Sequence, residues 1–176
     1  MASAFGHAAA TWAIKNVLQL LTHLPVRILL LGVIFSILPD IDVIAFRFGI
    51  PYESMWGHRG ITHSILFAFV LCALTTLMVA KTKKEHLTFF FFLFLATLSH
   101  SLLDALTTGG KGVAFFTPFD NTRYFFPWQV IKVSPIGVKN FFSDRGVAVL
   151  LSELKWIGIP LLISLFILYI RKFKQV

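Results

Sequence analysis

The sequence of 176 residues contains one cysteine, Cys72, and only eight acidic residues against sixteen basic ones. A lone cysteine excludes both a disulfide framework and a thiolate zinc site. Any bound metal must therefore be held by nitrogen and oxygen ligands. The formal net charge is +8, but the basic residues lie near the ends of apolar segments and in one loop, without a basic helix or an aromatic RNA-binding pattern. We therefore expect no nucleic acid partner, and we attribute the charge to contact with anionic lipid or a phosphorylated substrate.

The first ten residues lack the basic region and the clean cleavage site of a secretory signal peptide, so we expect the N-terminus to be retained. The sequence is 57% hydrophobic and contains twenty phenylalanines, and its mean hydropathy is +0.80. Such a composition indicates an integral membrane protein. The length suits one domain over residues 1–176, and no internal repeat is apparent.

Three apolar stretches predict helices that span the membrane, at residues 61–80, 87–106 and 154–170. The first two approach the roughly twenty apolar residues that a crossing requires. Residues 7–21 and 26–38 predict two further helices that form a tilted or partly inserted hairpin, the second ending at Pro39.

Residues 41–60 have the glycine and proline content of a loop, and residues 107–152 form a long connection rich in glycine, proline and aromatic residues. Aromatic side chains favour the membrane interface. The predicted fold is therefore an all-α membrane bundle of four to five helices, with a long aromatic loop before the last helix.

Basic residues in the short loops predict the orientation. Arg27, the turn at residues 81–84 and the cluster at residues 171–174 fall on one side, which the positive-inside rule places in the cytoplasm. His23 and His86 lie at the same side, where solvated histidines are ordinary. The other side, predicted to face outward, collects His7, Asp40, Asp42, His58, His63, His100 and Asp104.

His100 and Asp104 are four residues apart in an apolar helix, so both lie on one helix face and can reach one point. Ionisable groups in such a segment usually face a cavity, a partner or a metal. Together with the other residues of the outward side, they offer imidazole and carboxylate ligands, which suit zinc, manganese or iron. Two metals can share a bridging carboxylate, and Asp104 is the natural bridge.

Simpler interpretations stay open for several of these residues. His100 and Asp104 could form a hydrogen-bonded pair without metal, and Asp40 and Asp42 could end a helix or pair with Arg47 or Arg59. His63 could hydrogen-bond a backbone group or a neighbouring carboxylate. Arg59 and Arg123 could bind phosphate or meet lipid headgroups, and Glu153 could be a helix-dipole partner or a ligand.

The motifs of the chain resemble those of a bacterial inner-membrane metal-dependent hydrolase family, often called YdjM-like. They are Leu38-Pro-Asp-Ile-Asp42, His58-Arg-Gly-Ile-Thr-His-Ser64, His100-Ser-Leu-Leu-Asp104 followed by Gly109-Gly110, and Phe116-Thr-Pro-Phe119. The resemblance implies a multi-pass protein of the bacterial inner membrane, with its metal site on the outer face under the orientation above.

The order of these residues is also remotely similar to the zinc-dependent phospholipase C and P1 nuclease superfamily, helical enzymes that cleave phosphoesters. This similarity implies metal ligands at His7, Asp40, His58, His100 and Asp104. Further histidines of that superfamily are missing, since Val149 stands where one is expected, although Glu153 could match its last carboxylate. The similarity thus implies at most two metals, or a site completed by Asp42 and His63.

We therefore predict a membrane-bound metal-dependent hydrolase that cleaves a phosphoester of a lipid-like substrate, with one or two divalent transition metals, zinc first among them. Asp42 or His63 would orient ligands or move a proton, and Arg59 would neutralise phosphate charge. The alternative is a non-enzymatic membrane protein, either a metal carrier or a structural or regulatory partner that uses the cluster to hold a metal. Ionisable residues gathered at one end argue against a carrier.

Overall fold

The computed structural model describes residues 1–18 and 23–173, and helices make up most of it. In chain order these are α1 (Ala4–Leu18), α2 (Val26–Ile37), η1 (Leu38–Phe48), η2 (Ile61–His63), α3 (Ile65–Val79), α4 (Lys83–Ala105), α5 (Val138–Phe141), α6 (Asp144–Glu153), η3 (Leu154–Gly158) and α7 (Ile159–Phe173). The predicted all-α membrane bundle is confirmed. The predicted end of the first helix at residues 19–21 and the last basic residue, Lys174, lie outside the described residues.

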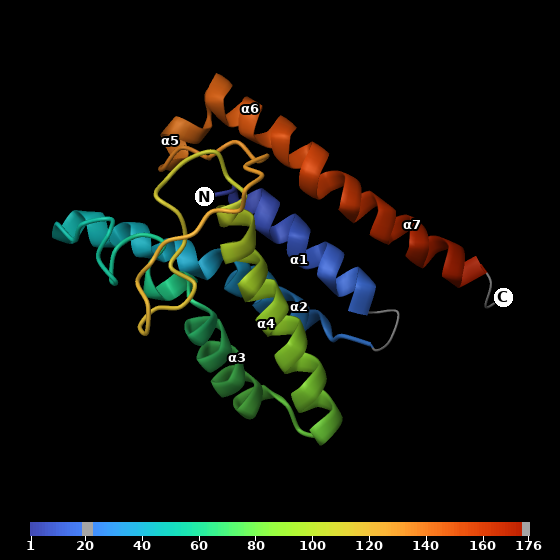
Figure 1. The fold of residues 1–176 in the computed structure, drawn as a ribbon. Helices are drawn as coiled ribbons and strands as arrows, with labels where there is room; N and C mark the ends of the chain where they lie inside the picture. The colour runs from blue at the N-terminus through green and yellow to red at the C-terminus, as the bar shows by residue number, and fades with distance from the viewer. Residues whose placement is uncertain (19–22, 174–176) are drawn as a thin grey trace.

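Helices α1, α2 and α4 form the centre of the bundle, with α3 against α4 and α7 alongside α1 (Figure 1). The core between α2 and α4 is built from buried apolar side chains such as Ile28, Phe35, Phe89 and Phe92. Gly32 of α2 lies where α4 crosses, and a Cβ at this position would come within 2.6 Å of the Phe92 ring. The missing side chain of Gly32 therefore allows the two helices to approach this closely.

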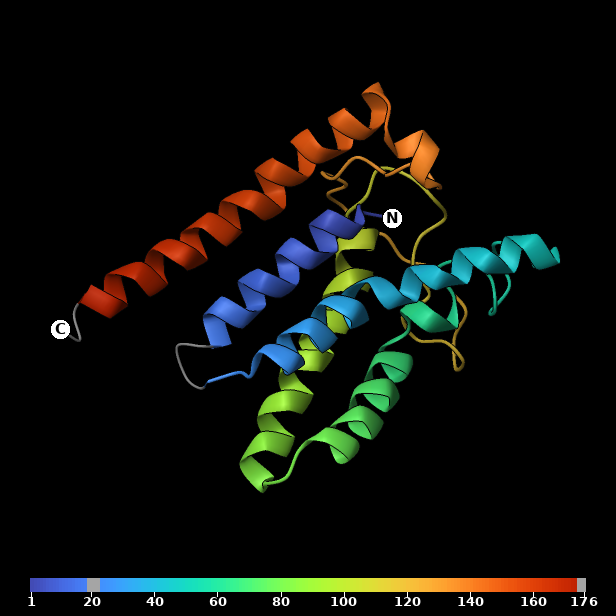
Figure 2. The same cartoon turned by 180° about the vertical axis from the view of Figure 1, so that it is seen from behind.

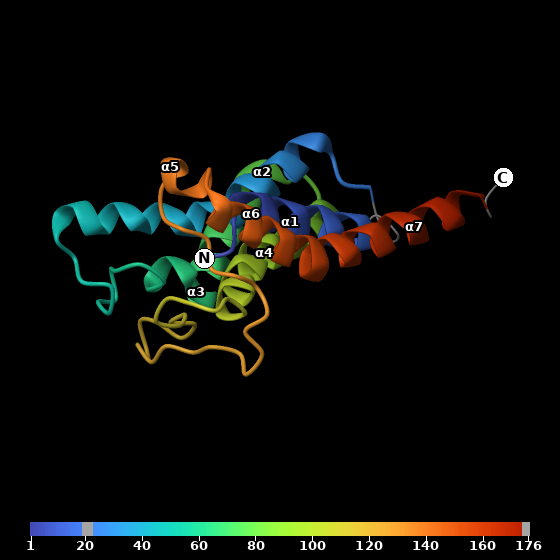
Figure 3. The same cartoon turned by 90° about the horizontal axis from the view of Figure 1, so that it is seen from above.

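The second helix does not end at Pro39 as predicted. It continues as the 3-10 helix η1, which has Pro39 in its first turn and ends at Gly49, a left-handed residue with φ of 70°. Pro39 has no N–H to donate to a carbonyl of α2, and the helix changes from α to 3-10 geometry at this point without ending. The prediction of a loop over residues 41–60 is therefore wrong for its first part, and η1 projects beyond the bundle (Figure 3).

The predicted helices over residues 61–80 and 87–106 are present with shifted starts. Helix α3 begins at Ile65, because the Ser64 hydroxyl accepts a hydrogen bond from Phe67 N and caps the helix. Helix α4 begins at Lys83, one turn before its apolar run, because the Thr82 hydroxyl caps the N–H of Glu85. Polar caps thus set both starts, whereas the predicted limits followed hydropathy alone.

The last helix begins earlier than predicted. Residues 144–153, assigned from the sequence to the long connection, form α6, which runs through the π-helical turn η3 into α7. The π turn ends just before Pro160, which lacks an N–H and crowds the carbonyl of Trp156 four residues earlier. Widening the helix at this turn accommodates Pro160 without ending the helix.

Among the described residues, three helical segments are long and apolar enough to cross a membrane: Val26–Phe48, Lys83–Ala105 and Asp144–Arg171. Helix α3 is apolar but shorter. Along α7, large apolar side chains such as Leu162 and Phe166 are more than half exposed. A helix that is apolar on its open faces is suited to lipid contact.

The connection over residues 106–137 lies across one end of the bundle and folds back on itself at two places. Thr107 pairs with Ile131, and Val113 pairs with Tyr124, as isolated β-bridges. The N-terminus lies at the same end, beside the last turn of α4 (Figure 2). The polar residues at this end are thus enclosed by the chain itself.

Replacing Gly32 with alanine should destabilise the bundle. The added methyl group would overlap the buried Phe92 ring, and overpacking of this kind costs about 1–3 kcal/mol. Gly158→Ala is the matched control, because its Cβ would meet only the tip of the exposed Leu154 side chain. Thermal unfolding in detergent should show a lower Tm for Gly32→Ala and no loss for Gly158→Ala; equal Tm values would contradict the close crossing.

Candidate metal centre

Four elements bring their polar residues to one end of the bundle. His7 lies in the second turn of α1, Asp40 in the first turn of η1, His63 at the end of η2, and His100 and Asp104 in the last turns of α4. Four of the five, His7, His63, His100 and Asp104, are wholly inaccessible to solvent, and Asp40 is buried. The convergence predicted from the sequence is therefore present.

Asp40, His63, His100 and Asp104 form the tighter part of this cluster, with one ligand atom from each inside 4.8 Å of the others. The Nε2 atoms of His63 and His100 are 3.0 Å apart. Asp40 Oδ1 lies 3.4 Å from the Nε2 atom of His100 and 3.8 Å from that of His63. Asp104 Oδ2 lies 3.7 Å from His63 Nε2.

These separations fit a single metal ion. Ligand atoms about 2.0–2.1 Å from a tetrahedral zinc ion are separated from one another by about 3.3 Å. Asp40 Oδ1 is also buried without any hydrogen-bond partner, and a buried polar atom without a partner is costly. Asp104 Oδ2 forms an ion pair with Arg59. Two imidazole nitrogens and two carboxylate oxygens could therefore hold a divalent transition metal.

The ring of His100 is fixed in the orientation that a ligand requires. Its Nδ1 lies 2.7 Å from the carbonyl oxygen of Ser36, at the end of α2. Because a carbonyl can only accept, Nδ1 donates this hydrogen bond, and Nε2 faces Asp40 and His63. Metal-binding histidines are commonly held by such a bond on the far nitrogen.

Asp42 holds the surrounding loop in place. Its Oδ1 accepts a hydrogen bond from His58 Nδ1 at 2.5 Å. Its Oδ2 lies 2.6 Å from the Thr62 hydroxyl, 3.0 Å from the backbone N of Arg59 and 3.1 Å from His63 Nδ1. Asp42 thus orients His63 through the nitrogen opposite the cluster. Its role toward a bound metal stays a prediction.

His58 lies beside the cluster rather than inside it. It belongs to a second group of candidate ligands with Asp42 and His63, and its ring centroid is 5.6 Å from that of His63. Burial lowers the pKa of His58, while its hydrogen bond to Asp42 opposes the shift. The sequence placed His58 before His63 as a ligand; the geometry favours the reverse order.

His7 is the fifth candidate ligand. Its ring stacks on His100 at a centroid distance of 3.9 Å, and its Nε2 is 3.6 Å from Asp104 Oδ1. Both ring nitrogens are buried without a hydrogen-bond partner. His7 could therefore complete the coordination of an ion held by the other four residues.

The side chain of Arg59 is fully buried, and its partners belong to the protein. Nε lies 3.0 Å from Asp104 Oδ2, and the terminal nitrogens donate to the Gly109 carbonyl and the Thr107 hydroxyl. Arg59 also has a positive φ of 62°, a strained conformation for a residue with a side chain. The sequence carries no signal for this turn, which aims His58 and Arg59 in different directions.

The two outer residues whose roles the sequence left open have structural contacts. Arg123 donates to the backbone carbonyls of His58, Tyr52 and Ser54, so it braces the loop. Glu153 accepts hydrogen bonds from the backbone N and the hydroxyl of Ser3. It lies at the end of α6 and belongs to neither ligand group found among the described residues.

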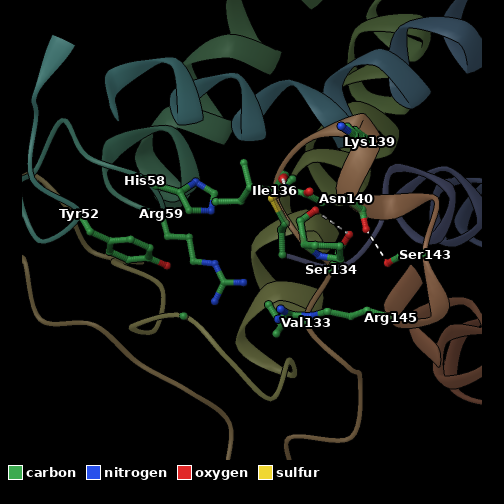
Figure 4. Close-up of a pocket in the computed structure, with 13 residues that line it drawn as sticks. Tyr52, His58, Arg59, Val133, Ser134, Ile136, Lys139, Asn140, Ser143 and Arg145 are labelled. Carbon is green, nitrogen blue, oxygen red and sulfur yellow. Dashed lines mark hydrogen bonds between the residues drawn. The ribbon is translucent and has the colours of Figure 1, made fainter. Parts of the chain in front are cut away.

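A cavity of about 680 Å³ opens next to the cluster (Figure 4). Tyr52, His58 and Arg59 line one side, and residues of α5 and the start of α6 line the other. Burial raises the pKa of Tyr52, so its hydroxyl stays protonated and can donate a hydrogen bond. The polar cluster thus has a chamber beside it that could admit a ligand.

Comparison with known proteins agrees with this architecture. The model of the YdjM inner membrane protein family matches residues 1–176. The chain belongs to this family. It is 42% identical over 150 residues to the inner membrane protein YbcI of Escherichia coli (strain K12), and the alignment covers 85% of this chain and 87% of that protein. No solved structure matches the chain.

The predicted family is therefore confirmed, and with its apolar helices the chain is a multi-pass inner membrane protein. The similarity to the phospholipase C and P1 nuclease superfamily stays a prediction.

Replacing Gly110 with alanine should disturb the cluster through Arg59. Its Cβ would come within 2.7 Å of an Arg59 terminal nitrogen, which is held beside Asp104. Gly137→Ala is the matched control, since Gly137 also has a positive φ but has no atom closer than 3.8 Å to the added Cβ. Thermal unfolding should show a loss of stability larger by about 1–3 kcal/mol for Gly110→Ala; equal losses would mean that only backbone strain matters.

Proposed function

We propose that this protein is a metal-dependent hydrolase of the inner membrane that cleaves a phosphoester of a lipid-like substrate. The observation that carries the proposal is the buried cluster of Asp40, His63, His100 and Asp104, whose ligand atoms lie within 4.8 Å of one another, with a chamber bordered by the neighbouring His58 and Arg59. A metal ion bound there supplies Lewis acidity, which polarises a phosphoryl oxygen and makes water a better nucleophile.

The residues of the chain would divide the work as follows. Asp40, His63, His100 and Asp104 hold the ion, zinc first among the candidates, and His7 completes its coordination or supports a second ion. Asp42 orients His63 and His58. His58, which borders the chamber, moves the proton between water and the leaving group. Arg59 holds Asp104 in position and contributes positive charge at the chamber wall.

The location also supports a lipid-like substrate. The cluster lies where α2 passes into η1 and where the apolar helix α4 ends, so apolar helices border a polar site that could hold a headgroup. Basic residues of the short loops, including Arg27 and the turn at residues 81–84, lie at the opposite end of the bundle. Under the positive-inside rule, the site would then face outward from the cytoplasm.

A structural metal site is the second candidate, because every residue of the four-member group is buried. Four protein ligands that close a site around an ion stabilise a fold without catalysis. The chamber beside His58 and Arg59 favours the hydrolase, since a purely structural site needs no access.

Elemental analysis of the detergent-purified protein tests the metal site. The wild type should contain one or two equivalents of a transition metal, and His100→Ala and Asp104→Asn should lose it because each removes a ligand. His86→Ala is the control, since His86 lies at the opposite end of the same helix. A wild-type protein without metal, which also takes up none when zinc is added, would refute both the hydrolase and the structural metal.

Replacing His58 with alanine separates proton transfer from metal binding. We expect the variant to keep its metal and to hydrolyse phospholipids about 10²–10⁴ times more slowly, the usual contribution of a general acid or base. Hydrolysis is measured as phosphate or headgroup release, and metal content is measured on the same samples. Loss of the metal in His58→Ala would instead show that His58 is a metal ligand, as the sequence predicted.

A further inference from the structure

All charged side chains that line the chamber within the described residues are basic. Arg59, Lys139 and Arg145 line it, and none of the lining residues within the described parts of the chain is acidic. Tyr52, Asn140 and Ser143 add neutral polar groups. Its volume of about 680 Å³ falls in the range of small-molecule sites, about 300–1,000 Å³.

Two of these three cations have no acidic partner. Arg59 is paired with Asp104 behind the chamber wall. Lys139 and Arg145 are exposed, and neither forms an ion pair within the described residues. By contrast, Lys111, a nearby exposed lysine, is paired with Glu53. The side of the chamber formed by α5 and α6 therefore carries two uncompensated positive charges, across the chamber from Arg59 and His58 (Figure 4).

The charge of the chamber selects a class of headgroup. Phosphate monoesters carry close to two negative charges near neutral pH, and these would pair with Lys139 and Arg145. A choline or ethanolamine headgroup also carries a cation, for which the chamber offers no carboxylate. Among the described residues, Tyr52 is the one phenylalanine, tyrosine or tryptophan that lines the chamber, and its ring face is already occupied by the Arg123 guanidinium at 5.0 Å.

We infer that this chamber binds the anionic phosphate headgroup of an amphiphile that lacks a cationic group, through Lys139 and Arg145. The inference names the substrate class of the proposed hydrolase and rests on that function, but binding and hydrolysis can be measured separately. The two cations recognise phosphate charge, which a lipid headgroup and free phosphate share. We assign the site to a lipid headgroup because the chamber lies at one end of a bundle of apolar helices.

The test is equilibrium binding to the full-length protein in detergent, with dioctanoyl phosphatidic acid and dioctanoyl phosphatidylcholine as probes that share the same chains. The wild type should bind phosphatidic acid at least about tenfold more tightly, as expected for charge-assisted hydrogen bonds. The double variant Lys139→Ala/Arg145→Ala should lose this preference. Lys81→Ala/Lys84→Ala removes the same charge at the opposite end of the bundle and should keep it.

Equal affinity for the two lipids, or an equal loss in both double variants, would overturn the inference. Inorganic phosphate serves as the competitor that separates the two sources. Weak competition assigns the site to a lipid headgroup, whereas competition as strong as that of the lipid would overturn the assignment to an amphiphile. Selective binding without hydrolysis would refute the proposed function and leave the binding site intact.

Discussion

Burial of carboxylates at the end of an apolar bundle is the constraint on which this structure depends. Asp40, Asp42 and Asp104 are at most 8% exposed, and a buried carboxylate is stable only when it is paired or hydrogen-bonded. Their partners come from distant parts of the chain: the Arg59 side chain pairs with Asp104, and the backbone N–H of Ala2 donates to the same residue. Satisfying the carboxylates therefore requires α1, α2, α4 and the loop before η2 to meet at one place.

The apolar helices and the polar end support each other. Helices α2 and α4 cross closely at Gly32. Ser36, which lies four residues after Gly32 in α2, is therefore within hydrogen-bonding distance of His100. The carbonyl of Ser36 then sets which nitrogen of His100 faces the cluster. Packing in the apolar part of the bundle thus determines the chemistry available at its end, and a shift between these two helices would move a candidate ligand.

Spacing along the sequence predicted those parts of the site that lie within a single helix. His100 and Asp104 were identified because a helix places residues four apart on one face. The continuation through Pro39 could not be read from the sequence, because it depends on a change from α to 3-10 geometry. His63, and not His58, faces the cluster because of the left-handed turn at Arg59. Lys139 and Arg145 reach the chamber only through the folding of a long connection. Such long-range contacts leave no periodic pattern.

In the proposed enzyme, the carboxylates of the cluster and the cations of the chamber would act on the same substrate. Three buried carboxylates face the Arg59 guanidinium and the N-terminal ammonium group, which lies 3.8 Å from Asp104 Oδ2. The carboxylates still outnumber these two cations by one, and the excess negative charge would repel the anion that Lys139 and Arg145 attract. A divalent cation among Asp40, His63, His100 and Asp104 would remove that repulsion. Binding of the metal and binding of the phosphate headgroup would then strengthen each other by the same factor, because coupling between two sites is reciprocal. The chamber would hold its substrate best when the cluster is ready to act on it.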